Sequence, residues 1–170
     1  MAAPGFAQEQ ATYRYDAYGR LVGVARSVTA SAGSYTGYGN DDADNRLSRG
    51  VVSVPVLAVV QELRPGETLV PFQRLISTDS RFTFSFQVDG NLVLNFGTTP
   101  LWNSATNNGQ GLSLRMETKG NLVLYSATDT VLWSSGTSGH PGAKLVLQND
   151  GNAVIYDGAT PVWATHTCCH

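Results

Sequence analysis

Charged residues are scarce in this sequence. Asp, Glu, Lys and Arg together make up 14% of its 170 residues, whereas about 25% is typical of soluble globular proteins. The net charge is −2 and the basic residues form no cluster, which argues against nucleic acid or an anionic membrane surface as a partner. In place of charge the chain has 18 Gly and frequent Ser, Thr and Asn. This composition favours β-structure with many tight turns.

Long hydrophobic runs are also lacking. The longest, Val54 to Val60, contains a proline and is far shorter than the roughly 20 residues of a membrane span. The first ten residues, MAAPGFAQEQ, lack the basic and apolar regions of a complete signal peptide. They are either the end of such a peptide, with a cleavage site at Phe6 to Gln8, or a plain polar terminus. On the first interpretation we expect a secreted or cell-surface protein.

Common enzyme and metal motifs are lacking as well. The sequence has no G-x-S-x-G, no H-E-x-x-H and no Gly-rich phosphate loop, so we expect neither an enzyme nor a cofactor. Residues 40–51 imitate half of a calcium loop, but Asn45 and Val51 stand where an EF-hand needs Gly and Glu. Cys168 and Cys169 are adjacent, which no zinc motif matches. A bridge between neighbours about 3.8 Å apart would be strained, so we expect a loose tail or an interchain disulfide.

A unit of about 30 residues occurs three times. Each copy has an apolar alternating pattern, a turn with Asp-Gly or Lys-Gly, a second apolar pattern and then a Trp. Corresponding Asn residues are 30 and 31 positions apart, and corresponding Trp residues are 31 and 30 apart. These markers are Asn91, Asn121 and Asn152, and Trp102, Trp133 and Trp163. Two independent markers with one period predict three repeats, at about 66–105, 106–136 and 137–167.

Each copy predicts a β-hairpin, because Asp-Gly supports the positive φ angles of a two-residue turn. One such unit cannot bury its own apolar face, so three units should share a core. We therefore expect about four strands per copy and twelve from residue 51 on, in three four-stranded sheets around a pseudo-threefold axis. Alternation places every second side chain in this core together with the three Trp. The expected core residues are Leu92, Leu94, Leu122, Leu124 and Ile155. The Asn, Val and Tyr between them should line an outer face.

The third copy carries the full pattern Q-x-D-x-N-x-V-x-Y. Its members are Gln148, Asp150, Asn152, Val154 and Tyr156. With its threefold recurrence, the pattern resembles the bulb-type, or monocot, mannose-binding lectins, over about residues 62–167. The resemblance implies an all-β, β-prism II fold for residues 51–170 and calcium-independent binding of mannose-containing glycans. It also implies that Gln, Asp, Asn and Tyr form hydrogen bonds with the sugar and that Val is an apolar contact.

The chemistry of these residue types points the same way. An ionised Asp accepts hydrogen bonds, Gln and Asn both donate and accept, and Tyr adds a phenolic hydroxyl, which together match the vicinal hydroxyls of a hexose. Each bond contributes only about 0.5–1.5 kcal/mol, so several weak sites should act together. Asp-Gly-Asn is also ordinary hairpin chemistry. The alternative is a structural or assembly protein, or an adhesion or antibacterial protein, that keeps the lectin fold with little sugar binding.

The other two copies depart from the pattern. In the first, Asn95 replaces the Tyr, which predicts a weakened secondary site. The members that remain there are Gln87, Asp89, Asn91 and Val93. In the second, Glu117 and Lys119 replace Gln and Asp, so the amide donor and the acidic acceptor are lost. That site, with the remaining Asn121, Val123 and Tyr125, is expected to be degenerate for neutral mannose.

Residues 1–50 have a different character. Tyr13 to Leu21 reads Y-x-Y-D-x-x-G-R-L, which resembles the YD repeat of RHS-type bacterial proteins, and residues 38–47 are a looser copy. We expect two hairpins here, and we expect Val51 to Val60 to complete the first sheet of the lectin fold. The Tyr-rich composition suits an interface. Residues 1–60 are therefore predicted to mediate a homo-oligomer or a larger surface assembly, with a flexible tail as the alternative.

Overall fold

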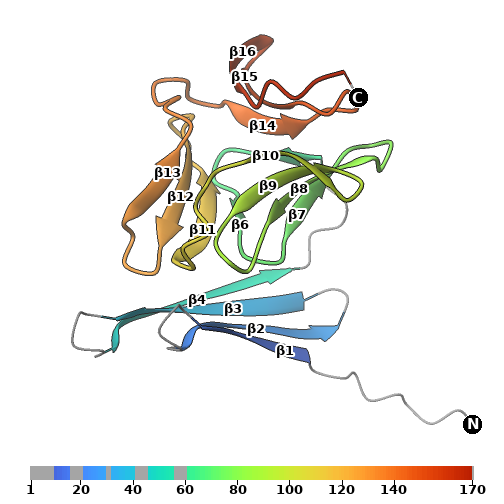
Figure 1. The fold of residues 1–170 in the computed structure, drawn as a ribbon. Helices are drawn as coiled ribbons and strands as arrows, with labels where there is room; N and C mark the ends of the chain where they lie inside the picture. Colours follow the sequence, from blue (N-terminus) through green and yellow to red (C-terminus); the bar gives the residue numbers. More distant parts are fainter. Residues whose placement is uncertain (1–9, 16–20, 30–31, 41–45, 56–60, 170) are drawn as a thin grey trace, which may run out of the picture.

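The computed structural model is built entirely from antiparallel β-sheets (Figure 1). It describes residues 10–15, 21–29, 32–40, 46–55 and 61–169, and within the first four ranges the side chains of Tyr13, Leu21 and Val24. Those residues contain no helix, so the described part of the chain has none that could span a membrane. The expectation of an all-β fold is confirmed.

Twelve strands form a prism of three four-stranded sheets, as the repeats predicted. Sheet I contains β7 (Arg74–Ile76), β8 (Phe82–Phe86), β9 (Leu92–Phe96) and β10 (Thr99–Asn103). Sheet II contains β6 (Thr68–Leu69), β11 (Gly111–Met116), β12 (Leu122–Ser126) and β13 (Val131–Ser134). Sheet III contains β5 (Glu62–Leu63), β14 (Lys144–Leu147), β15 (Ala153–Asp157) and β16 (Thr160–Ala164).

One continuous segment supplies the outer strand of all three sheets. Residues 62–76 run through β5 of sheet III and β6 of sheet II before they reach β7 of sheet I. The prediction of four strands per copy is therefore wrong for the second and third copies, which contribute three strands each. This segment ties the sheets together, because its two-residue strands pair with β14 and β11.

The core follows the predicted alternation. In β8, Phe82, Phe84 and Phe86 are buried while the Thr and Ser between them are partly exposed, which is the period of two expected of a strand with one face covered. The five predicted Leu and Ile residues are also fully buried. All of them belong to one cluster that fills the space between the three sheets.

The three Trp residues mark the pseudo-threefold axis. Their ring centroids are 5.7 to 5.9 Å apart, with interplanar angles of 73° to 83°, which is the edge-to-face geometry that aromatic rings prefer. They pack against the core cluster but are only partly buried, so the prediction that they are buried in the core is only partly met. The reason is position: β10, β13 and β16 are edge strands, which have a neighbouring strand on one side only.

The N-terminal residues form a separate four-stranded sheet. It is a meander of β1 (Gln10–Tyr15), β2 (Leu21–Thr29), β3 (Ala32–Asn40) and β4 (Arg46–Pro55). The two predicted hairpins are present as β1–β2 and β3–β4. The expectation that residues 51–60 complete the first prism sheet is wrong as far as Pro55, because β4 pairs along its length with β3, and residues 56–60 lie outside the described residues. β3 contacts β11 of the prism, and Figure 1 shows the sheet beside one end of it.

Candidate functional site

The hairpin of each copy turns through a three-residue loop rather than the predicted two-residue turn. The amide of Gly90 donates to the carbonyl oxygen of Gln87 (3.1 Å), and the amide of Gln87 donates to that of Asn91 (2.8 Å). The same two bonds close loops 118–120 and 149–151. The last residue of each loop has a φ between +87° and +93°, which Gly adopts without steric cost. The Gly of each Asp-Gly or Lys-Gly pair is therefore favoured by the turn itself.

The five predicted residues of the third copy lie together on the β14–β15 hairpin. Val146 pairs with Val154, and Lys144 pairs with Tyr156, which sets one row of side chains on the outer face of sheet III. Gln148 and Asn152 extend this row to the loop that contains Asp150. The structure thus brings together the residues that the sequence motif singled out.

Asn152 is held in one orientation by the loop after β16. Its side-chain oxygen accepts hydrogen bonds from the Thr165 hydroxyl (3.0 Å) and the Thr167 amide (3.3 Å). From the sequence, Asn was expected both to donate hydrogen bonds to a ligand and to accept them, but its side-chain oxygen already accepts two hydrogen bonds from within the protein. What Asn152 offers is its amide NH₂, fixed in direction and bonded to no acceptor among the described residues.

The loop in turn presents an acceptor beside this donor. One carboxylate oxygen of the exposed Asp150 accepts the Asn152 backbone amide (2.9 Å), which orients the carboxylate and leaves its second oxygen open. The Gln148 side-chain amide donates to the Tyr156 hydroxyl (2.9 Å). This hydrogen bond joins one side chain at the loop end of the hairpin to one further along β15, with Val154 between them in the sequence. Val154 is only 3% exposed, so its predicted apolar contact is confined to a small surface.

A pair of hydroxyl residues behind each Asn is the feature that the sequence interpretation missed. The first of the pair stands two residues after the repeat Trp and the second stands four residues after it. In each copy the first hydroxyl donates to the Asn oxygen and the second donates to the carbonyl oxygen of the loop Gly. The three pairs are Ser104 and Thr106, Ser135 and Thr137, and Thr165 and Thr167. The pattern W-x-[ST]-x-T was the available signal.

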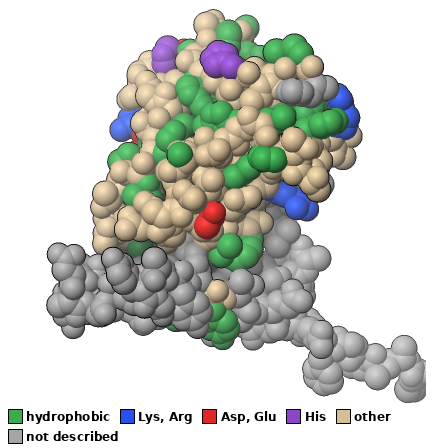
Figure 2. All heavy atoms as spheres, viewed as in Figure 1, with side chains coloured by type: hydrophobic (Ala, Val, Ile, Leu, Met, Phe, Trp, Pro, Cys, Tyr) green, Lys and Arg blue, Asp and Glu red, His purple; other side chains and the backbone are tan. Residues whose placement is uncertain are grey.

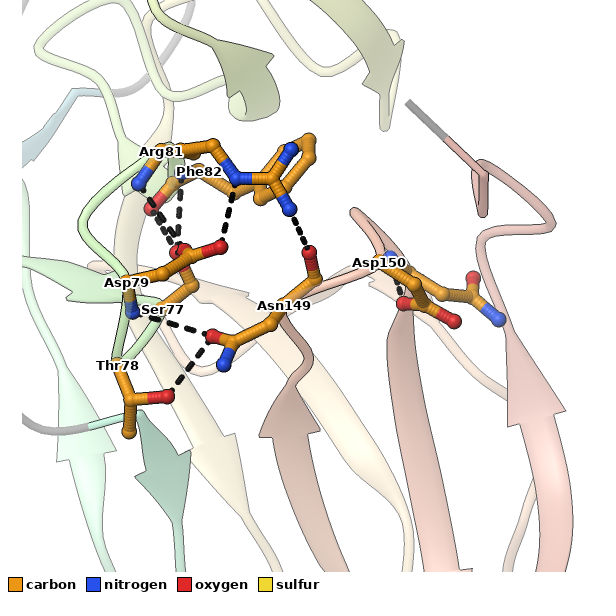
Figure 3. Close-up of polar contacts among 8 residues, drawn as sticks. Ser77, Thr78, Asp79, Arg81, Phe82, Asn149 and Asp150 are labelled. Carbon is orange, nitrogen blue, oxygen red and sulfur yellow. Dashed lines mark hydrogen bonds and ion pairs between the residues drawn. The ribbon is translucent and has the colours of Figure 1, made fainter.

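The third loop is also clamped by sheet I (Figure 3). The Arg81 guanidinium donates to the carbonyl oxygen of Asn149 (2.6 Å). The Asn149 side-chain oxygen accepts the Thr78 hydroxyl (2.8 Å) and the Asp79 amide (3.2 Å). Bonds from the Ser77 hydroxyl (2.7 Å) and from Arg81 (2.6 Å) hold the pKa of Asp79 at about 2, so this carboxylate is charged at neutral pH.

This clamp follows from the topology. β10 leads along the chain into β11, and β13 leads into β14, so the first two hairpin loops pack against segments to which they are covalently linked. Sheet III meets sheet I at β8, which lies much earlier in the chain. Side-chain bonds between the turn at residues 77–81 and Asn149 make that closure, and Asn149 immediately precedes Asp150 of the candidate site.

Cys168 and Cys169 extend the third site rather than forming a loose tail. The Cys169 amide donates to the carbonyl oxygen of Asp150 (2.7 Å). Gly109 and Gly139 make the corresponding bond in the other copies, with φ values of +78° and +102° against +81° for Cys169. Both thiols are free and exposed, with their sulfurs 2.7 Å apart, and the bond between them raises the pKa of Cys169. The predicted interchain disulfide remains a prediction.

The first copy keeps the Gln, Asp and Asn of the motif, and its Asn oxygen is held by the same two hydrogen bonds. The Asn91 oxygen accepts the Ser104 hydroxyl (3.1 Å) and the Thr106 amide (3.2 Å), and Asp89 accepts the Asn91 amide (2.9 Å). Val93 is 6% exposed, and Asn95 lies on the same face where the third copy has Tyr. A shallow groove of about 420 Å³ begins at this loop and runs along β7 and β8.

The second copy is closed by its own charges. Glu117 accepts a hydrogen bond from the Tyr125 hydroxyl (2.7 Å). This bond is the main cause of a raised pKa of Tyr125, and burial of the side chain is the second cause. The other oxygen of Glu117 is buried without a hydrogen bond, and the Lys119 ammonium lies 3.3 Å from it as an ion pair. Asn121 is clamped as in the other copies and Val123 is 2% exposed. The site therefore has a donor but no oriented acidic acceptor on its loop.

The face of the prism in Figure 2 is mainly uncharged. Backbone, polar and apolar groups cover most of it, with Lys and Arg near its margins, His at its top and an acidic side chain low on it. Among the described residues, no three His, Cys, Asp or Glu side chains come together as a metal site. A fixed amide donor beside a single carboxylate acceptor is suited to a neutral, polyhydroxylated molecule.

The chain is similar to several lectins of known structure. A Gastrodia elata monocot mannose-binding lectin is 37% identical, covering 64% of this chain and 96% of that one, with a TM-score of 0.57. The mannose-specific snowdrop (Galanthus nivalis) agglutinin, in complex with methyl-α-D-mannoside, is 38% identical, and the match covers 65% of this chain and 99% of the agglutinin, with a TM-score of 0.52. A Marasmius oreades lectin is 31% identical, and the match covers 64% of this chain and 92% of that lectin, with a TM-score of 0.60. Neither protein-family models nor curated protein sequences match the chain. With over 30% identity across nearly the whole of these lectins, the chain belongs to the bulb-type, or monocot, mannose-binding lectin family.

Proposed function

We propose that this chain is a non-enzymatic lectin that binds mannose-type sugars, without calcium, through its third copy. The observation that carries the proposal is the pairing of the fixed Asn152 amide with the open Asp150 carboxylate oxygen. Vicinal sugar hydroxyls need one acceptor and one donor at adjacent positions, and a donor already held in place loses little entropy on binding. The sugar bound to the related snowdrop agglutinin supports the choice of mannose.

The three copies should differ in strength. The third has all five motif residues. The first has the same clamped Asn and an oriented Asp89 but no Tyr, so it is the secondary site. In the second, Glu117 is occupied by Tyr125 and Lys119, so it contributes little to the binding of a neutral sugar.

A matched pair of Asn variants tests this proposal. Asn152→Ala and Asn121→Ala each remove an Asn held by a hydroxyl and a backbone amide, so they cost similar stability. Titration with methyl-α-D-mannoside should show that Asn152→Ala loses most of the affinity and that Asn121→Ala keeps it. A glycan array on the purified protein then identifies the preferred oligosaccharide. Equal affinity in both variants and the wild type would contradict the proposal.

The N-terminal sheet favours a second role in assembly. Its strands form a sheet of their own with β1 and β4 as the edge strands, and Tyr13 is 53% exposed. We propose that it pairs with another copy of the chain or with a larger surface structure, and that the protein is secreted or displayed at the cell surface. Mass measurement in solution with and without residues 1–60 tests the assembly proposal, since two monomers of equal stability would contradict it.

Cell fractionation tests the proposed location outside the cell or at its surface.

A further inference from the structure

The groove beside the first copy contains an aromatic residue in an unusual backbone conformation. Phe72 has a φ of +77°, which is disfavoured for any side chain with a Cβ. It occupies the third position of the turn Val70 to Gln73, which follows Pro71 and is closed by the Gln73 amide donating to the Val70 carbonyl oxygen (3.0 Å). Proline followed by a residue with positive φ defines a type II turn, where Gly is the usual residue.

The chain contains its own comparison for this turn. Six residues earlier, the turn Arg64 to Glu67 also has a Pro in second place and is closed by the same bond (2.9 Å). Its third residue is Gly66, with a φ of +86°. Gly66 donates to a carbonyl oxygen of β11 (2.7 Å) and Phe72 donates to one of β8 (2.8 Å). The two turns are thus structural equivalents, and Phe72 stands where Gly is the less strained choice.

The Phe72 ring does not offset this strain by entering the core. The residue is 50% exposed, and it borders the groove together with Arg74, Gln87 and Asp89. Exposed aromatic rings contact the C–H faces of pyranoses, which combine an apolar face with polar edges. The first copy has Asn95 in place of the motif Tyr and otherwise lacks an aromatic wall.

Arg74 adds a polar group to the same groove. Its side chain is exposed, and it forms no hydrogen bond or ion pair within the described ranges. The guanidinium presents several donors in one plane. A sugar lying on the Phe72 ring would therefore find hydrogen-bond donors at its edge.

We propose that the first copy is the start of an extended site for an oligosaccharide. One sugar binds at Gln87, Asp89 and Asn91, and the next stacks on Phe72 and accepts hydrogen bonds from Arg74. The inference rests on the proposed lectin function, and it gives the first copy a ligand class of its own, di- and oligosaccharides.

The variant Phe72→Gly separates binding from folding. In an Asn152→Ala background, which leaves the first copy as the main site, titrations with methyl-α-D-mannoside and with an α-linked mannobiose give the preference for the disaccharide. We expect a preference of about 3- to 10-fold, the size of an aromatic contact, and its loss in Phe72→Gly. Because Gly relieves the strained φ, the melting temperature should not fall. Val131→Ala removes an equally exposed apolar side chain (55%) away from the groove and should keep the preference.

The outcomes distinguish this inference from the proposed function. A preference that survives Phe72→Gly overturns the extended site and leaves the lectin function intact. The extended site is likewise overturned if only the third copy binds sugar, as shown by full loss of binding in Asn152→Ala. If the wild-type protein binds neither sugar, the proposed function itself fails and the inference fails with it.

Discussion

The Thr165 hydroxyl should determine both the stability of the third loop and the affinity of its site. It accepts the Ala153 amide (3.0 Å) and donates to the Asn152 oxygen (3.0 Å), and the residue is 8% exposed. Thr165→Val keeps the shape and removes both bonds, together with the contact between the Thr165 and Thr167 hydroxyls (2.8 Å). A buried amide that loses its acceptor costs about 1–3 kcal/mol, so the free energy of unfolding should fall by about that amount, as measured by urea denaturation.

The same substitution should weaken sugar binding. With the hydroxyl gone, the Asn152 oxygen keeps only the longer bond from the Thr167 amide (3.3 Å), and its NH₂ is no longer fixed. A loss of up to one hydrogen bond, about 0.5–1.5 kcal/mol, corresponds to a roughly 2- to 12-fold lower affinity for methyl-α-D-mannoside by calorimetry. The control is Thr160→Val, an exposed Thr at the start of β16, the strand that precedes Thr165. Unchanged affinity in Thr165→Val would refute the role of Thr165 in positioning Asn152. If the stability were unchanged as well, the hydrogen bonds of the Thr165 hydroxyl would have no effect on the third loop.

Three further predictions concern other parts of the prism. Gly151→Ala should destabilise the protein by at least about 2 kcal/mol in urea denaturation, because its Cβ would lie 2.6 Å from the Phe82 ring at a φ of +91°; wild-type stability would contradict the packing. The pKa of Asp79 is lowered to about 2. Its contribution to the free energy of unfolding is therefore complete above its unfolded pKa near 4 and is lost as the pH falls toward 2. Acid denaturation of Asp79→Asn should therefore show a shallower loss of stability across that window, and an identical curve would be evidence against the clamp. The double variant Glu117→Gln, Lys119→Asp restores the full motif in the second copy and should add one site to the stoichiometry measured by calorimetry; an unchanged count means that the motif alone is insufficient.

Local patterns predicted most of the prism. The Asn and Trp markers recur with one period because each copy needs the same turn and the same core position, so spacing alone located the three hairpins. Alternation in β9, β12 and β15 assigned Leu92 and its equivalents to the core correctly. The motif residues from Gln148 to Tyr156 lie on one hairpin, where the repeat pattern placed them, although its loop has three residues rather than the predicted two.

What the sequence did not predict depends on contacts between distant segments. Arg81 and Asn149 are 68 residues apart, and nothing near either one indicates the other. The apolar run at residues 51–55 suits an edge of any antiparallel sheet, so its pairing with β3 could not be distinguished from pairing with the prism. Val154 was assigned to an exposed face by alternation, but the Gln148–Tyr156 bond beside it depends on side-chain geometry that a period of two does not contain.

The proposed lectin function depends above all on the third loop presenting Asn152 and Asp150 to a sugar. A titration of the isotope-labelled protein with methyl-α-D-mannoside, followed through the side-chain amide signals of Asn and Gln by NMR, observes this contact directly. We expect saturable shifts for the side-chain amides of Asn152 and Gln148, smaller ones for Asn91, and none for Asn121. A folded protein whose Asn152 and Gln148 signals stay unmoved at saturating sugar would contradict the proposal.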